Sequence, residues 1–372
     1  MIKNELSMRQ TAVIMCVLGA ASKLMLWPTS LASACGNALW LPPLVDTAVQ
    51  TAAVWAVALI GSKTGKTLFE LFSQSFTKPV ACAIYALLSL FFVLSAVVPM
   101  SEQQLMVHEV FYDTIPSIWV FLPFFFFSVY AGSKGLTNAG RTAECCLLLF
   151  IVSMLFLLSL AVTECDFNLL LPVLDSPAGD IAKACFGGMH RSISGVYMAV
   201  FAGNFRYKRG DAAKISAACA AGGIIVSAVC ALFYAQYGEL ALTQYFAVAK
   251  LAVFSPVVAL VGRLDLIAVY VLDAAILFSI VLNIQAAVYC MYCVTGREWH
   301  PLYSLLCNGA LFAVTLLFNN SFALVQRVAE SDLSVAAAAF TFALPALAWT
   351  AYAVAKAGNG RGRTAAAERG GK

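Results

Sequence analysis

The sequence predicts an all-α polytopic membrane protein, with ten transmembrane helices. Of its 372 residues, 62% are hydrophobic and 11% are charged, and the mean hydropathy is +0.86. A soluble domain has about half apolar and a quarter charged residues, so this composition excludes an ordinary soluble protein. The apolar residues also gather in runs that are long enough to cross a bilayer as helices.

The ten predicted helical spans lie within a single membrane domain, residues 1–356. Their approximate ranges are 11–34, 40–61, 80–101, 117–133, 143–163, 180–205, 213–235, 264–292, 300–318 and 335–356. No small-residue cleavage site follows the first run, so we expect a retained span rather than a signal peptide. The Gly- and Arg-rich tail, residues 357–372, is predicted to be disordered.

The basic residues predict how these spans are oriented. When the ten spans are threaded through a bilayer, most of the 23 Lys and Arg residues fall on one side. Cytoplasmic loops are enriched in these residues, so this side is the inner one. The sequence therefore predicts that the N-terminus and the C-terminus are both cytoplasmic.

The first span contains a small-residue tract at its centre, formed by Gly19, Ala20, Ala21 and Ser22 and followed directly by Lys23. A lysine at mid-membrane depth costs roughly 2.5–3.5 kcal/mol. Such a tract either lets two helices pack closely or interrupts the helix beside a binding site.

The sixth span has the same character. Its middle holds glycines, basic residues and small residues, namely Gly187, Gly188, His190, Arg191, Ser192, Ser194 and Gly195. Spans one and six are five apart, so they cross the membrane in opposite directions. Interrupted helices at corresponding places of two inverted halves indicate a transporter-type site near the midplane. We therefore predict discontinuous helices one and six in two inverted five-helix repeats, about 11–163 and 180–318, with further closing helices.

Few other polar residues lie inside the predicted spans. Asp46 in span two and Asp273 in span eight are ionisable, and such groups usually face the bundle interior and pair. Asp273 is either a structural partner or a ligand group. Ser279 and Asn283 lie one turn apart in span eight. They either line the site, which we predict, or make simple hydrogen bonds between helices.

Lys23 allows two interpretations. It could recognise an anionic ligand group, or it could be a structural cation paired with Asp46 or Asp273. An unpaired lysine in an empty pocket would be costly. We therefore predict the structural role, with Lys23 near the edge of the site.

Five segments follow one another along the chain in a recognisable order. They are "LSMRQTAVIMCVLGAASKLMLWPTSLASACGNALWL", "GKTLFEL", "NLLLPVLDSPAGDIAKACFGG", "YKRGDAAK" and "RLDLIAVYVLDAAILFSIVLNIQAAVYC". In order and spacing, these segments resemble the spore-germination permease family. That family comprises the B subunits of endospore nutrient-germinant receptors, within the amino acid–polyamine–organocation superfamily.

The resemblance implies a ten-helix fold of two inverted halves, with a ligand site between spans one, three, six and eight. It also implies recognition of a small nutrient, often an amino acid, and assembly with receptor A and C subunits in the spore inner membrane. The positions that match the family's ligand site are Gly19, Ala20, Ala21, Ser22, Ser95, Ser192, Ser194, Gly195, Ser279 and Asn283.

The sequence leaves three functions open. The one we predict is a germinant-receptor subunit, and the others are a cation- or proton-coupled amino acid permease and a membrane scaffold that does not transport. We expect no enzyme, cofactor or metal site, because no span carries a nucleophile–base pair or a set of metal ligands. The expected partners are a small nutrient, the receptor subunits and the lipid bilayer, with no nucleic acid. The expected location is the spore inner membrane or the cell membrane.

Overall fold

The fold consists of helices throughout the part of the chain that the structure describes. The structure is a computed structural model, which describes residues 6–110, 117–173, 175–205, 207–253, 265–297, 301–318, 324, 327 and 332–370. Its α-helices are α1 (Met8–Ala20), α2 (Trp27–Cys35), α3 (Leu41–Thr64), α4 (Leu68–Ser75), α5 (Lys78–Ser95), α6 (Val97–Val110), α7 (Ser117–Gly132), α8 (Leu136–Val162), α9 (Ala178–Gly188), α10 (Ser194–Phe201), α11 (Asp211–Tyr237), α12 (Ala247–Val253), α14 (Asp265–Thr295), α15 (Pro301–Phe318) and α17 (Asp332–Gly370). The 3-10 helices are η1 (Ala21–Lys23), η2 (Gly36–Ala38), η3 (Phe167–Leu170), η4 (Met189–Arg191) and η5 (Gly238–Thr243).

Six helices among the described residues are long and apolar enough to cross a membrane. They are Leu41–Thr64, Lys78–His108, Leu136–Val162, Asp211–Thr243, Val269–Thr295 and Ala338–Ala357. A bent pair, Met8–Lys23 with Trp27–Ala38, makes a seventh if it counts as one span. Two shorter apolar helices, Trp119–Gly132 and Pro301–Leu317, coincide with the predicted fourth and ninth spans. The chain is therefore a multi-span helical membrane protein, and the count of ten stays a prediction.

The predicted sixth span is divided between two short helices. The helix α9 has 11 residues and α10 has 8, and neither reaches the about 20 residues that a membrane helix needs. A straight spanning helix is thus absent from the described residues between 178 and 201. This division is what the sequence predicts for a discontinuous helix.

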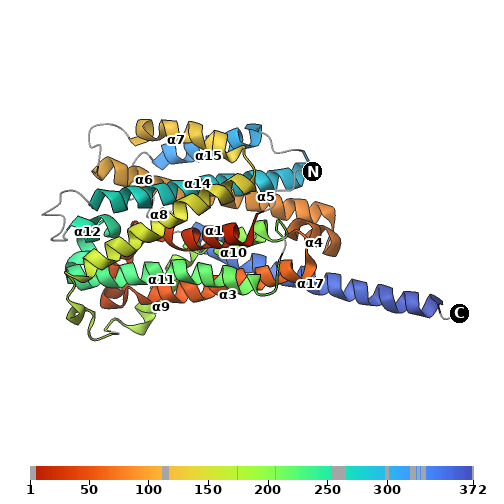
Figure 1. Cartoon of the computed structure of the whole chain (residues 1–372), viewed down its shortest axis with the longest axis horizontal. Helices are drawn as coiled ribbons and strands as arrows, with labels where there is room; N and C mark the ends of the chain where they lie inside the picture. The colour runs from red at the N-terminus through yellow and green to blue at the C-terminus, as the bar shows by residue number, and fades with distance from the viewer. Residues whose placement is uncertain are drawn as a thin grey trace.

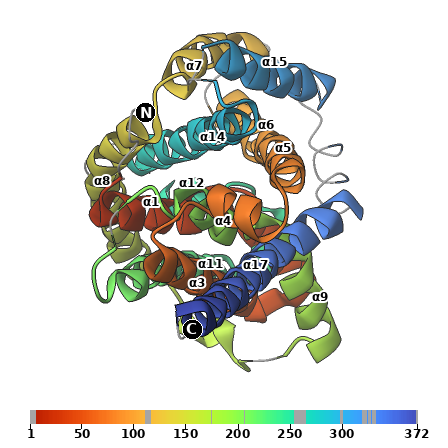
Figure 2. The same cartoon turned by 90° about the vertical axis from the view of Figure 1, so that its right-hand side faces the viewer.

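The helices run mostly along the long axis of the molecule (Figure 1). The helices α7 and α15 lie side by side along one edge, and α3 and α11 lie together on the other side of the centre (Figures 1 and 2). In both views α1 lies between α14 and this α3–α11 pair. The helix α14 packs against α5 and α8, so α1 and α14 both belong to the interior.

Glycines allow α1, α3 and α11 to approach one another closely. A Cβ added at Gly222 of α11 would overlap the backbone oxygen of Cys16, and one at Gly223 would overlap the Thr47 side chain. A Cβ at Gly19 would lie 3.1 Å from the backbone oxygen of Cys219. Small residues at such crossings are how membrane helices gain close packing. This crossing fixes α1 against α11 just before α1 ends.

The last helix continues beyond the predicted membrane domain. Helix α17 includes residues 357–370, for which the sequence predicts disorder, and it extends past the other helices towards the C-terminus (Figure 1). Alanines in this segment favour a helix, whereas its glycines disfavour one. The disordered state of this tail stays a prediction.

Candidate functional site

The first predicted span is interrupted in the structure. Helix α1 ends at Ala20, the 3-10 turn η1 covers Ala21–Lys23, and α2 begins at Trp27. The two halves are bent by 60°. Pro28 stands in the first turn of α2, where its missing N–H costs nothing because that position has no helical partner. The same proline prevents the helix from continuing regularly through this point.

The interruption lies slightly later than the small-residue tract. We expect Gly19 to Ser22 to be non-helical, but Gly19 and Ala20 are still part of α1. The close crossing with α11 explains this, because Gly19 is used for packing. Ala21 and Ser22 lie in the interruption itself. Both interpretations of the tract therefore hold, each for one half of it.

The sixth predicted span is interrupted over residues 189–193. Helix α9 ends at Gly188, the turn η4 follows, and Ser192 has a ψ of 61°, outside the helical region. We expect Ser192 to Gly195 to be non-helical, but helix α10 begins at Ser194, so Ser194 and Gly195 are helical. A Cβ at Gly195 would lie 2.9 Å from the Cβ of Ala53, so this glycine also serves packing against α3.

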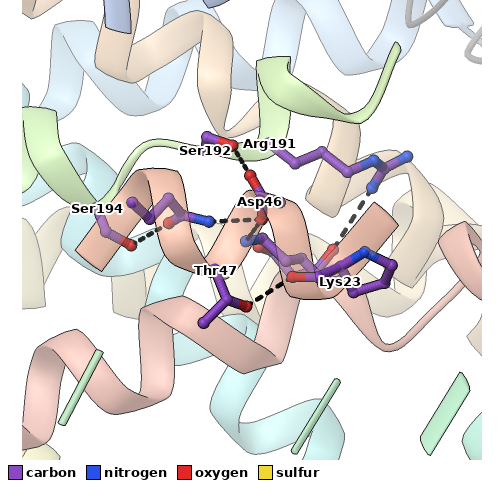
Figure 3. A network of polar contacts seen from close by, with 9 residues as sticks. Lys23, Asp46, Thr47, Arg191, Ser192 and Ser194 are labelled. Carbon is purple, nitrogen blue, oxygen red and sulfur yellow. Dashed lines mark hydrogen bonds and ion pairs between the residues drawn. The ribbon is translucent and has the colours of Figure 1, made fainter. Parts of the chain in front are cut away.

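The two interruptions meet. A Cβ at Gly188 would lie 2.5 Å from the Trp27 ring, so the end of α9 touches the beginning of α2. The Arg191 guanidinium donates from Nη1 to the backbone oxygen of Ser22, at 3.5 Å. That oxygen belongs to the interrupted part of span one, where backbone groups lack regular helical partners. Figure 3 shows Arg191 reaching across to this segment.

Asp46 of α3 binds both interruptions at once. Its Oδ2 accepts from the Lys23 ammonium, and its Oδ1 accepts from the Ser192 hydroxyl (Figure 3). Lys23 and Asp46 are 1% and 2% exposed, so this ion pair is shielded from water. Lys23 therefore pairs with Asp46, and not with the alternative partner Asp273.

Gln50 extends this group by one turn of α3. Its Nε2 donates to Asp46 Oδ2 at 2.6 Å, and its Oε1 accepts from the Ser194 hydroxyl at 2.6 Å. We call Lys23, Asp46, Gln50, Ser192 and Ser194 the first cluster. Every buried side-chain N and O atom of these five has a partner among the described residues. The i, i+4 spacing of Asp46 and Gln50 indicates their shared face, but no sequence signal indicates that Ser192 and Ser194 bind there.

A second buried ion pair joins span six to span three. Arg191 Nη2 lies 2.9 Å from Glu102 Oε1 of α6, with side chains that are 11% and 3% exposed. Beside it on α6, the Gln103 side chain lies close enough to Asp273 of α14 to influence that carboxylate. We call Glu102, Gln103, Arg191 and Asp273 the second cluster. Sequence reasoning missed it because Glu102 follows an apolar run and looks like the beginning of an amphipathic extension.

Ser279 and Asn283 are buried within α14. Ser279 donates to the Ile276 backbone oxygen at 2.7 Å, and Asn283 Nδ2 donates to the Ser279 backbone oxygen at 3.2 Å. Asn283 Oδ1 has no partner among the described residues. These bonds stay within α14, so simple interhelical hydrogen bonding does not account for either side chain. That they line a ligand site stays a prediction.

Ser95 lies at the end of α5, next to α14. Ser89 donates to the Ala287 backbone oxygen at 3.1 Å, and Cys82 contacts the Val294 oxygen seven residues further along, so the two helices are antiparallel. This register brings Ser95 level with the α14 turn that holds Ser279 and Asn283. Ser95 is half-buried there.

Comparisons with known proteins agree with this architecture. The sequence profile described as spore germination protein matches residues 5–323. Curated protein sequences give no match. Among solved structures, one similar protein is Mhp1, a nucleobase-cation-symport-1 family transporter with bound bromovinylhydantoin. The similarity covers 90% of this chain and 78% of Mhp1, with 13% identity and a TM-score of 0.58. MhsT, in complex with L-phenylalanine, is similar over 91% of this chain and 89% of its own, with 14% identity and a TM-score of 0.60. At these identities the likeness shows a common transporter-type fold.

Proposed function

The chain belongs to the spore germination protein family, and on that premise we propose that it is a germinant-receptor B subunit. In this proposal it binds a small nutrient, most simply an amino acid, where the two interrupted helices meet, and it signals together with receptor A and C subunits. The observation that carries the proposal is that Asp46 accepts from Lys23 of the first interruption and from Ser192 of the second. A site of this kind lies near the bilayer midplane in transporters of similar architecture.

The proposal includes the predicted ten-helix membrane domain, its two inverted repeats and the cytoplasmic termini. It also keeps the predicted ligand residues of spans one, three, six and eight, from Gly19 to Ser22, Ser95, Ser192 to Gly195, Ser279 and Asn283. The amino acid ligand is supported by the resemblance to MhsT, whose structure contains L-phenylalanine. Backbone groups freed at the interruptions would bind its polar ends, because lipid cannot satisfy them.

The second candidate is a cation- or proton-coupled amino acid permease. The similarity to Mhp1, which its description calls a transporter, favours this candidate. Binding and transport need the same junction, so an uptake measurement separates the two candidates. The purified protein should be tested by thermal-shift binding with a panel of the twenty amino acids and by uptake of the same panel into proteoliposomes. Binding without uptake supports the receptor, and uptake supports the permease.

Asn283 provides a test of the ligand site with a matched control. We expect Asn283→Leu to abolish binding of any amino acid that binds the wild type. Asn308 of α15 is equally buried, at 2% exposed, and donates in the same way to a carbonyl one turn back. Asn308→Leu should therefore disturb folding as much as Asn283→Leu and leave binding unchanged. Equal loss of binding in both variants would contradict the assignment of Asn283 to the site.

A further inference from the structure

The second cluster has an imbalance of charge. Glu102 and Asp273 contribute two carboxylates, and Arg191 contributes one guanidinium. Arg191 pairs with Glu102, and Asp273 forms no ion pair with any described residue. Lys23, the other buried cation of this region, is already bound to Asp46. One negative charge is therefore left without a cationic partner among the described residues.

Acceptor oxygens of the same cluster also lack partners. Glu102 Oε2, Gln103 Oε1 and Asp273 Oδ1 are buried and form no hydrogen bond within the part of the chain that the structure describes. The three side chains are 3%, 1% and 8% exposed. Leaving one such group unpaired costs about 1–3 kcal/mol, and more when it is charged. Each buried polar atom without a partner needs an explanation, and a bound ion or ligand group is one of them.

The chemistry of these atoms selects the type of ligand. Carboxylate and amide oxygens are hard acceptors that suit alkali cations, and a primary ammonium offers three N–H donors. A single positive charge would neutralise the surplus carboxylate. Arg191 already neutralises one of the two carboxylates, so a divalent ion would leave the cluster with a surplus positive charge. A monovalent cation therefore matches both the charge and the acceptors.

We propose that Glu102, Gln103 and Asp273 form a subsite for a monovalent cationic group, at the junction of α6, η4 and α14. The occupant is either an alkali ion or the primary ammonium of a bound nutrient. The ammonium source rests on the proposed function, whereas the alkali ion does not. In this subsite Asp273 is a binding group and not the structural partner of Lys23.

The test uses the full-length protein in detergent, without any nutrient. Its thermal unfolding midpoint is measured against increasing NaCl, KCl or methylammonium chloride, with the ionic strength held constant by choline chloride. Choline has no N–H donor and is too bulky to replace a small cation. We expect a saturable increase of the midpoint with at least one of the three salts. Asp273→Asn should weaken this apparent affinity at least tenfold.

The controls separate the site from general effects of charge. Asp180→Asn removes a carboxylate that pairs with exposed Lys183 in α9, and its salt response should equal that of the wild type. If Asp273→Asn does not fold, Gln103→Leu replaces it, because this change removes one acceptor and keeps every charge. No saturable response to any of the three salts, or an unchanged response in the folded variant, would overturn the proposal.

The three salts also identify the source of the cationic group. Together with the amino acid panel, they separate the subsite proposal from the proposed function. A response to NaCl or KCl identifies an alkali ion, and a response to methylammonium alone identifies an ammonium group. If no amino acid binds but the Asp273-dependent salt response is present, the proposed function fails and the subsite stands. If amino acids bind equally to wild type and Asp273→Asn without any salt response, the subsite fails and the proposed function stands.

Discussion

The two buried polar clusters have similar residues but different bonding. In the first, Lys23 and Asp46 pair, and Gln50, Ser192 and Ser194 complete their hydrogen bonds. In the second, Arg191 and Glu102 pair, but oxygens of Glu102, Gln103 and Asp273 have no partner among the described residues. Residues 191 and 192 belong to one interruption, so neighbouring side chains enter different clusters.

This difference in bonding indicates that the two clusters have different roles. A fully bonded buried network rigidifies its surroundings, while a partly bonded one is costly unless something binds. The first cluster would hold the two interruptions at a fixed distance. The second would change its bonding when a cationic group arrives. The substitutions below test these different roles, from the largest expected loss of stability to the smallest.

Asp46→Asn should cause the largest loss. It removes the charge partner of Lys23 while the lysine stays buried, and breaking a buried pair in this way costs about 3–5 kcal/mol. The thermal unfolding midpoint in detergent should decrease strongly, or folded protein should be lost. Lys183→Gln is the control, because its exposed pair with Asp180 contributes at most ~1 kcal/mol.

The double variant Lys23→Met/Asp46→Leu separates the charge from the geometry. Removing both charges leaves no uncompensated ion, so the double variant should be more stable than Asp46→Asn.

Lys23→Met alone should reduce stability more than it changes ligand preference. A stable Lys23→Met protein that has lost only its ligand response would make Lys23 a recognition residue instead.

Ser192→Ala should cause the next largest loss. Asp46 Oδ1 accepts from this hydroxyl, and a hydrogen bond to a charged group contributes about 1.5–3 kcal/mol. The midpoint should decrease by less than with Asp46→Asn, since Lys23 keeps its partner. Ser159→Ala is a suitable control, because among the described residues the exposed Ser159 hydroxyl donates to the Phe156 oxygen of its own helix. Equal midpoints for the two variants would show that Ser192 does not hold Asp46.

The sequence predicts the interruptions better than it predicts their partners. The small-residue tracts of spans one and six indicate that regular helix stops nearby, because local backbone chemistry decides this, and the structure places the two stops at Ala20 and Gly188. The sequence also predicts that Lys23 pairs with a buried acid, since such groups inside spans usually pair, but only the structure selects Asp46 over Asp273. The Arg191–Glu102 pair is not foreseeable, because it depends on how α6 lies against η4. The extent of the interruptions depends likewise on the crossing of α1 with α11, which only the three-dimensional packing reveals.

Two adjacent glycines test whether packing between the half-helices supports the first cluster. A Cβ at Gly188 would overlap the Trp27 ring, which is 4% exposed and has little room to move. Gly188→Ala should therefore cost about 1–3 kcal/mol, as overpacking does. A Cβ at Gly187 meets no atom within 4 Å. Gly187→Ala should be neutral or stabilising by up to about 1 kcal/mol, because alanine favours a helix. Equal midpoints for the two variants would contradict the contact between α9 and α2.

Asp273→Asn should cause the smallest loss, and this contrast with Asp46→Asn is the sharpest test of the comparison. Both changes replace a buried carboxylate by an amide of the same shape. Asp46 loses an ion pair, whereas Asp273 has none among the described residues to lose. Asparagine keeps an acceptor oxygen that can face Gln103, and it removes an uncompensated buried charge. In choline chloride alone, the unfolding midpoint of Asp273→Asn should therefore equal or exceed that of the wild type. A decrease as large as that of Asp46→Asn would show that Asp273 is anchored like Asp46 and that both clusters are structural.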